Sequence, residues 1–184
     1  MLKIKSYVKV TSIAEAYELN QKKTAIVLGG MVWLKMGNRN ISTAIDLSGL
    51  GLDGIQETDE EFVIGCMTTL RELEIDKRLN EYTQGAMKES VRHIVGVQFR
   101  NCATVGGSIW GRYGFSDVLT MFLGMDTWVE LHNAGKIPLT EFVNRKKDND
   151  ILVNIIIKKQ PLRVCYMSQR NTKTDFPVLT CCAS

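Results

Sequence analysis

The strongest constraint on the fold is the stretch 101–109, which reads N-C-A-T-V-G-G-S-I and sets two adjacent glycines between hydroxyl side chains. Such a loop, just before a helix, turns its backbone N–H groups inward and can surround an anion. Glycine lacks a Cβ atom, so the chain can take positive φ there and approach a bound phosphate closely. An apolar run at residues 25–28 ends in a second pair, Gly29-Gly30. We predict that the two loops close on one diphosphate, although either pair alone is as often a simple turn.

The composition is that of a soluble globular protein with a core of its own, because 45% of the 184 residues are hydrophobic and 23% are charged. The net charge of +3 comes from 23 basic and 20 acidic residues, and the basic residues are scattered apart from a short cluster at residues 145–147. We therefore expect no nucleic-acid partner and interpret the cluster as a solvated loop.

The five cysteines form no C-x-x-C pair and are odd in number, which favours a reducing compartment and argues against a metal site in this chain. No apolar segment approaches the roughly 20 residues that span a bilayer. Lysines interrupt the apolar residues at the N-terminus, unlike the continuous core of a signal peptide. We expect a cytoplasmic protein without a membrane partner.

The first part of the chain predicts a β-α-β unit. Residues 4–10 alternate polar and apolar side chains like a strand with one buried face, and Ser12 is placed to cap the helix that follows. Further strands are expected at residues 25–28 and 43–47, before a glycine-rich break at residues 48–54. The G-x-G-x-x-G spacing of a Rossmann fingerprint is absent.

The rest of the chain predicts a hairpin, helices and further strands. The hairpin is expected at residues 55–65, helices at 70–73, 85–95 and 118–125, and strands at 126–132, 151–157 and 163–167. The run at 151–157 is apolar enough for a central strand. Ser116 is a good cap for the helix that it precedes.

Asp117 has two interpretations. In the first turn of a helix, a carboxylate stabilises the helix dipole by about 0.3–1 kcal/mol. After a glycine loop it can instead accept the hydroxyl groups of a ribose, as acidic residues do in other nucleotide sites. Residue chemistry alone weights the two equally. The two histidines, His93 and His132, have no motif that joins them to a nucleophile, so we assign no catalytic residue.

Six elements follow one another across almost the whole chain: Leu28-Gly29-Gly30, I-G-C-M-T-T-L-R-E-L-E at 64–74, N-C-A-T-V-G-G-S-I, Ser116-Asp117, D-I-L-V-N-I-I-I from Asp150, and D-F-P-V-L from Asp175. In this order and spacing they resemble the FAD-binding subunit or domain of molybdenum hydroxylases, as in xanthine dehydrogenase. The chain departs from that pattern at Met31, where a polar residue is usual, at Ser108, where asparagine is common, and near Tyr166, where a lysine is frequent.

The resemblance implies an α/β (α+β) fold of the molybdopterin dehydrogenase type, with FAD between two subdomains. We expect a small subdomain at residues 1–53, a larger one at 54–172, and at 173–184 the start of a C-terminal domain that is largely absent. By analogy, the two loops hold the diphosphate, Asp117 meets the adenosine ribose and Leu152 flanks the nucleotide. The implied FAD contacts are Ile26, Val27, Leu28, Gly29, Gly30, Met31, Val32, Trp33, Thr104, Val105, Gly106, Gly107, Ser108, Asp117 and Leu152.

The function that the resemblance implies is electron relay. FAD would take electrons from the iron-sulfur clusters of a 2Fe-2S subunit, in a complex with a molybdenum-cofactor subunit, and pass them to NAD+ or another acceptor. Two alternatives remain open: a stand-alone FAD-dependent reductase of the wider fold, such as the peptidoglycan-precursor reductases, and a docking subunit without flavin. An apolar strand at residues 176–179 would leave an exposed edge that favours a homodimer in isolation.

Overall fold

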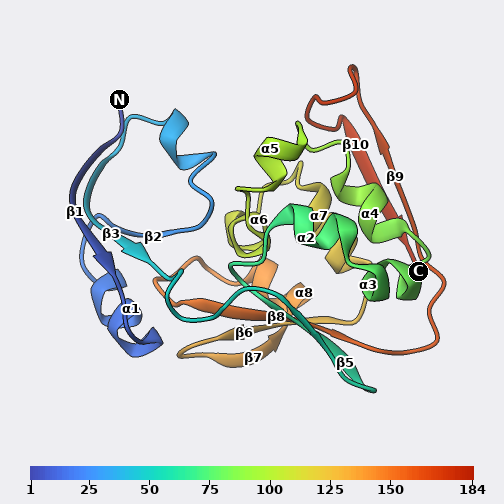
Figure 1. Cartoon of the computed structure of the whole chain (residues 1–184), viewed down its shortest axis with the longest axis horizontal. Coiled ribbons are helices and arrows are strands. Elements are labelled where there is room, and N and C mark those ends of the chain that lie inside the picture. The colour runs from blue at the N-terminus through green and yellow to red at the C-terminus, as the bar shows by residue number, and fades with distance from the viewer.

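The computed structural model describes all 184 residues, which form three successive β-sheets (Figure 1). The first sheet is parallel, in the order β1-β3-β2, and is built from β1 (Lys3–Lys9), β2 (Ala25–Leu28) and β3 (Asn40–Asp46). Helix α1 (Ile13–Asn20) connects β1 to β2, and the short 3-10 helix η1 (Leu34–Met36) precedes β3. Ser12 caps α1 by accepting the N–H of Glu15. The predicted β-α-β start is confirmed.

The second sheet is antiparallel, in the order β4-β5-β8-β6-β7. Its strands are β4 (Ile55–Glu57), β5 (Glu61–Gly65), β6 (Thr127–Leu131), β7 (Gly135–Pro138) and β8 (Leu152–Lys158). Strand β8 is central, as its apolar sequence predicts, and it pairs with β5 and β6. Ile155 and Ile157 belong to the main core, whereas Ile156 is buried outside it, paired with Val63 of β5 and Trp128 of β6.

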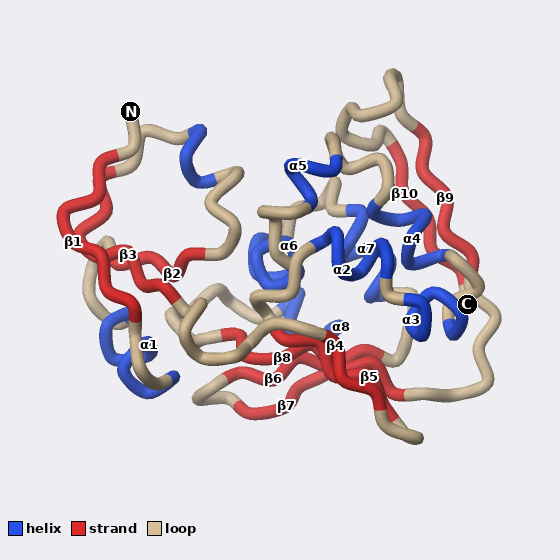
Figure 2. The backbone as a smooth tube through the Cα atoms, viewed as in Figure 1, coloured by secondary structure: helices blue, strands red, loops and turns tan.

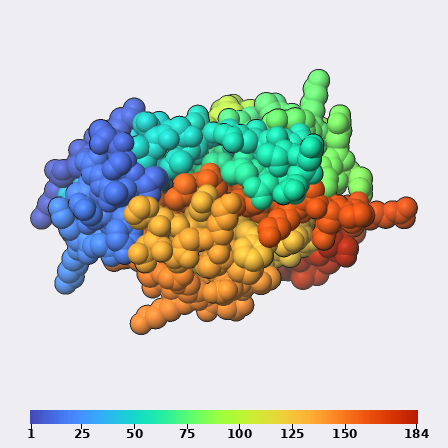
Figure 3. Space-filling model, turned by 90° about the horizontal axis from the view of Figure 1, so that it is seen from below, coloured from blue at the N-terminus to red at the C-terminus, as the bar shows by residue number.

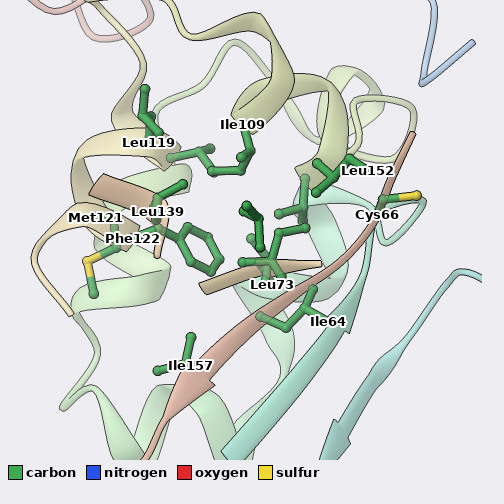
Figure 4. Close-up of a cluster of buried hydrophobic side chains, with 14 of the residues drawn as sticks. Ile64, Cys66, Leu73, Ile109, Leu119, Met121, Phe122, Leu139, Leu152 and Ile157 are labelled. Carbon is green, nitrogen blue, oxygen red and sulfur yellow. The ribbon is translucent and has the colours of Figure 1, made fainter. Parts of the chain in front are cut away.

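Seven short helices accompany this sheet. They are α2 (Leu70–Ile75), α3 (Lys77–Tyr82), α4 (Ala86–Val91), α5 (Val97–Arg100), α6 (Val105–Gly111), α7 (Asp117–Leu123) and α8 (Leu139–Asn144). Figure 2 shows α2 to α7 on one side of the sheet. Between these layers lies the main core, where Leu73, Ile109 and Phe122 meet side chains of the sheet such as Ile64 and Ile157 (Figure 4). The longest helix, α1, has eight residues, and no helix is long and apolar enough to cross a bilayer.

The third sheet is a hairpin of β9 (Cys165–Gln169) and β10 (Leu179–Ala183). It packs against α4 and α7 at the opposite end of the molecule from the first sheet (Figure 3). The predicted boundary between residues 172 and 173 lies in the loop that joins β9 to β10. The domain limits stay a prediction, since the hairpin pairs residues from both sides of that boundary.

Two predicted elements differ in extent. The helix expected at residues 85–95 ends at Val91, and Val95 lies in the left-handed region with φ of +50° and is half exposed. The apolar stripe therefore continues past the helix without prolonging it, because the chain must turn before α5. The strand expected at 176–179 begins only at Leu179, and Phe176 belongs to the preceding loop, where it packs on other aromatic rings.

A buried ion pair holds the chain just ahead of the second glycine loop. Arg100 Nε donates to Glu74 Oε2 at 2.8 Å and Nη2 donates to Oε1 at 3.2 Å, and both side chains are buried. Arg71 also pairs with Glu74. Burial alone would raise the pKa of Glu74, but the hydrogen bonds from Arg100 and Arg71 outweigh it and hold that pKa below its ordinary value. This pair joins α2 to α5 and so fixes the start of residues 101–104.

Replacement of Glu74 by Ala is expected to lower the free energy of unfolding by about 3–5 kcal/mol, because it leaves the Arg100 guanidinium buried without a counter-charge. The double variant Glu74→Leu/Arg100→Met should lose less. Glu89→Ala, which removes the exposed partner of Arg92, serves as the control and should change stability by less than about 0.5 kcal/mol. Urea titrations measure all three; equal losses for Glu74→Ala and Glu89→Ala would contradict the assignment.

The same pair predicts a pH dependence. A carboxyl group whose folded pKa is lowered contributes stability above its unfolded pKa of about 4.3, and this contribution disappears as the pH falls through the lower folded value. The wild type should therefore lose stability in that acid range more steeply than Glu74→Leu/Arg100→Met. Parallel acid titrations of the two proteins would show this difference.

Candidate functional site

The first glycine loop, residues 29–33, presents a row of free backbone donors where the chain leaves β2. The N–H groups of its five residues, Gly29, Gly30, Met31, Val32 and Trp33, donate no hydrogen bond within the chain. Met31 lies in the left-handed region with φ of +59°. Successive N–H groups around a left-handed residue converge into a concavity that suits an anion. The loop can therefore offer several backbone hydrogen bonds to one negatively charged ligand.

Met31 itself faces away from this concavity. Its side chain packs against the small core cluster of Leu28, Ile41 and Ala44 in the first sheet. A non-glycine residue in the left-handed region costs roughly 1–2 kcal/mol, and packing of the Met31 side chain offsets part of that strain. The absence of a polar side chain at this position thus leaves the backbone donors of the loop untouched.

The second glycine loop begins α6, and its backbone donors are already used. Val105 N–H donates to Thr68 O at 2.8 Å and Gly106 N–H to Cys66 O at 2.9 Å. Gly107 N–H donates to the capping hydroxyl of Thr104, and Ser108 N–H to the Thr104 carbonyl, both at 3.2 Å. The prediction that N–H groups turn inward around an anion is therefore wrong for this loop. Residues 104–108 can contribute a surface and side-chain hydroxyl groups instead.

The two loops are in contact, as predicted. A Cβ atom on Gly29 would lie 2.7 Å from Thr104 Oγ1, and one on Gly30 would lie 1.8 Å from the carbonyl oxygen of Cys102. A Cβ on Gly106 would lie 2.5 Å from Cys66 O. None of these glycines has positive φ, so that part of the expectation is wrong. Gly30 and Gly106 are needed because backbone packs directly on backbone there, whereas Gly29 faces the Thr104 hydroxyl. Of the second pair, Gly107 alone is exposed.

Gly30→Ala is expected to lower the free energy of unfolding by about 3 kcal/mol, since the added methyl group would overlap a backbone carbonyl that a rotamer change cannot move. Gly114→Ala is the matched control. Its Cβ would meet nothing within 4 Å, and its stability should stay within about 1 kcal/mol of the wild type. Thermal or urea unfolding measures both variants, and an unchanged midpoint for Gly30→Ala would show that the loops do not touch in solution.

Asp117 begins α7 and is almost fully buried, with 5% of its surface exposed. Its Oδ1 atom accepts a hydrogen bond from Tyr166 Oη at 2.5 Å and a second from the Arg170 guanidinium. Its Oδ2 atom accepts no hydrogen bond within the chain. Sequence reasoning missed this ion pair, because no local pattern joins residues 53 positions apart.

The remaining predicted residues lie on two strands and beside the loops. Ile26, Val27 and Leu28 belong to β2, and Val32 packs against the main core. Leu152 begins β8 and is buried at the edge of the core near Cys66 and Ile109 (Figure 4). Burial raises the pKa of the Cys66 thiol to about 12, so it stays protonated and serves as packing. Contact of Leu152 with a nucleotide stays a prediction.

Four aromatic rings gather beside the first loop, and the sequence offered no sign of them because they come from three segments. Trp33 contacts Tyr113 and Phe176 with ring centroids 5.7 Å apart, and Phe115 lies 4.5 Å from Phe176. Tyr113 and Phe115 are stacked at 5.2 Å. The cluster ties the first glycine loop to the segment between α6 and α7 and to the β9–β10 loop. Nowhere do three or more His, Cys, Asp or Glu side chains gather to hold a metal ion.

Comparison with known proteins identifies the family. Residues 2–159 match the family described as "FAD binding domain in molybdopterin dehydrogenase". The chain belongs to this family. The predicted membership and fold class are confirmed, and FAD is the cofactor of the family. The site fits the diphosphate of FAD, because the 29–33 loop holds unpaired N–H donors and lies against the second loop with no Cβ atom between them.

Curated relatives and solved structures agree on the fold. The uncharacterized protein YgfM of Escherichia coli K12 is 26% identical over 170 residues, 88% of this chain and 62% of its own length. The alpha subunit of the 6-hydroxypseudooxynicotine dehydrogenase complex of Paenarthrobacter nicotinovorans is 25% identical and is covered over 57% of its length. The Cu,Mo-CO dehydrogenase, in its cyanide-inactivated form, superposes with a TM-score of 0.84 at 22% identity over 96% of this chain and 68% of its own. The chain thus spans about three fifths of these curated relatives.

Proposed function

We propose that this chain binds FAD where its two glycine loops meet and acts as the electron-transfer unit of a molybdenum-containing oxidoreductase complex. The observation that carries the proposal is the contact of a loop of five unpaired N–H groups with a second loop whose own donors are satisfied. One loop can then donate to a diphosphate while the other closes the opposite side. Membership of the FAD-binding family supports the choice of ligand.

Each part of the chain has a separate task in this proposal. The N–H groups of residues 29–33 hold the diphosphate, and Thr104, Gly107 and Ser108 flank it from α6. Asp117 accepts hydroxyl groups of the adenosine ribose, and Leu152 borders the nucleotide. Bound FAD supplies the redox chemistry, because it accepts and releases electrons. The protein binds and orients it, and no side chain is assigned a proton-transfer step.

The partners follow from the relatives. The P. nicotinovorans relative is named as a subunit of a complex, and the solved CO dehydrogenase carries molybdenum. We infer that this chain works beside a molybdenum-cofactor subunit and a 2Fe-2S subunit, with NAD+ or another acceptor receiving the electrons. The relatives are named for substrates as unlike as carbon monoxide and 6-hydroxypseudooxynicotine. In the proposed complex, substrate choice therefore belongs to the molybdenum subunit.

Gly107→Val tests the site directly. Gly107 is exposed at the contact between the loops, and a Cβ there would meet only the Thr104 hydroxyl, at 3.1 Å. The larger side chain should obstruct the diphosphate and weaken FAD binding at least about tenfold, while stability changes by less than about 1 kcal/mol. Titration of the apoprotein, followed by flavin fluorescence, measures the affinity.

Gly37→Val is the control. Gly37 has an extended backbone, and a Cβ there would meet only Leu34 O, at 3.4 Å, so FAD affinity should not change. Equal affinities for Gly107→Val and the wild type would place the flavin elsewhere. A wild-type protein that stays colourless and takes up no added FAD would instead favour the docking subunit without flavin. Co-purification with a molybdenum subunit separates the relay from a stand-alone reductase.

A further inference from the structure

The β9–β10 hairpin contacts the proposed nucleotide site through two side chains, Tyr166 of β9 and Arg170, which directly follows the strand. Tyr166 and Arg170 both donate to the same oxygen of Asp117, across 49 and 53 residues of sequence. Tyr166 is 4% exposed, and the Arg170 side chain 8%. The Arg170 guanidinium is itself held by Ser168 Oγ, at 3.3 Å from Nε, and by the carbonyl of Asp175. These contacts form one hydrogen-bonded network around the Asp117 carboxylate.

The two oxygens of Asp117 have opposite surroundings. Oδ1 accepts both hydrogen bonds, whereas Oδ2 accepts none within the chain. An aspartate side chain turns readily about its last torsion, so two donors on one oxygen select one orientation of the carboxylate. A buried carboxylate also needs a counter-charge, which Arg170 supplies. The result is an oriented oxygen with free lone pairs, suited to hydroxyl donors.

We propose that Tyr166 and Arg170 are positioning residues, which hold Asp117 so that its Oδ2 atom accepts the 2′- and 3′-hydroxyl groups of the adenosine ribose. The inference rests on the proposed function and deepens it, because it assigns the selection of the adenosine half to the hairpin. One oxygen can accept both hydroxyl groups of a vicinal diol, since it carries two lone pairs.

The chemistry of Tyr166 suits this role. Burial raises the pKa of its phenol well above the ordinary value, and the hydrogen bond to Asp117 raises it further. Tyr166 therefore remains a donor across the physiological range. Its ring fills space in the core, so Tyr166→Phe removes the donor and keeps the packing. Arg170→Lys keeps the charge and removes the second arm of the guanidinium.

The test compares FAD with an analogue whose adenosine carries a 2′,3′-dideoxyribose. The wild type should bind FAD at least about tenfold more tightly than the analogue, the size expected for hydroxyl groups that donate to a carboxylate. Tyr166→Phe and Arg170→Lys should weaken FAD binding about tenfold and leave the affinity for the analogue unchanged. Thermal unfolding establishes that each variant is folded. The double variant Asp117→Asn/Tyr166→Phe should bind FAD no more weakly than the single variant Asp117→Asn, since both substitutions act through the Asp117 carboxylate.

A control variant and the possible outcomes distinguish a positioning role for Tyr166 and Arg170 from a general effect on the protein. Tyr82→Phe removes another phenol that makes hydrogen bonds, to the backbone of Gln160, and should leave the preference for FAD intact. The positioning role would be overturned if Tyr166→Phe and Arg170→Lys kept the full wild-type preference for FAD over the analogue. It would also be overturned if the two variants lost affinity for FAD and for the analogue equally. A wild type that binds FAD and the analogue equally would remove Asp117 from the ribose while leaving FAD binding in place. A wild type that binds neither would overturn the proposed function itself.

Discussion

The site depends on direct contact between two stretches of backbone. Gly30 lies so close to the carbonyl of Cys102 that no side chain fits between them, and Gly106 lies as tightly against Cys66. Gly30 lies in the loop that follows β2 and Cys102 in the segment before α6, so this contact brings together two parts of the molecule more than 70 residues apart in sequence. Polypeptide backbones can approach this closely only at glycine, so each Gly-Gly pair has one glycine, Gly30 or Gly106, that the packing requires.

In the proposed site, the two loops differ in what they can offer an anion. The N–H groups of residues 29–33 donate no hydrogen bond within the chain and are free to donate to a ligand. In the first turn of α6, every N–H group already donates to an acceptor within the chain. That difference follows from their surroundings. The α6 turn donates to the carbonyls of Cys66 and Thr68, beside the end of β5, whereas the N–H groups of residues 29–33 find no acceptor within the chain. In the proposed site, residues 29–33 therefore supply the hydrogen-bond donors, and the first turn of α6 supplies a surface beside them.

A second long-range contact involves Asp117. This residue of α7 accepts hydrogen bonds from Tyr166 and Arg170 of the β9–β10 hairpin, so a segment near the end of the chain contacts the carboxylate of the proposed ribose site. Phe176, in the loop of the same hairpin, also packs on Trp33 at the end of the first glycine loop. The hairpin thus contacts the site twice, once by charge and once by aromatic packing. These contacts join the hairpin both to the start of α7 and to the first glycine loop.

Local patterns were enough to predict the β-α-β start, the central strand β8 and the caps at Ser12 and Ser116, because periodicity and capping are properties of short segments. The order of the motifs was enough to predict the family. Sequence reasoning also placed the two glycine loops together, as two sides of one diphosphate site. It explained their glycines by positive φ, which none of the four has, and it credited α6 with donors that Cys66 and Thr68 already occupy. Only the tertiary structure decided which N–H groups remain free, which oxygen of Asp117 is occupied and which aromatic rings meet beside Trp33. Each of these depends on which distant residue comes into contact, and no local propensity carries that information.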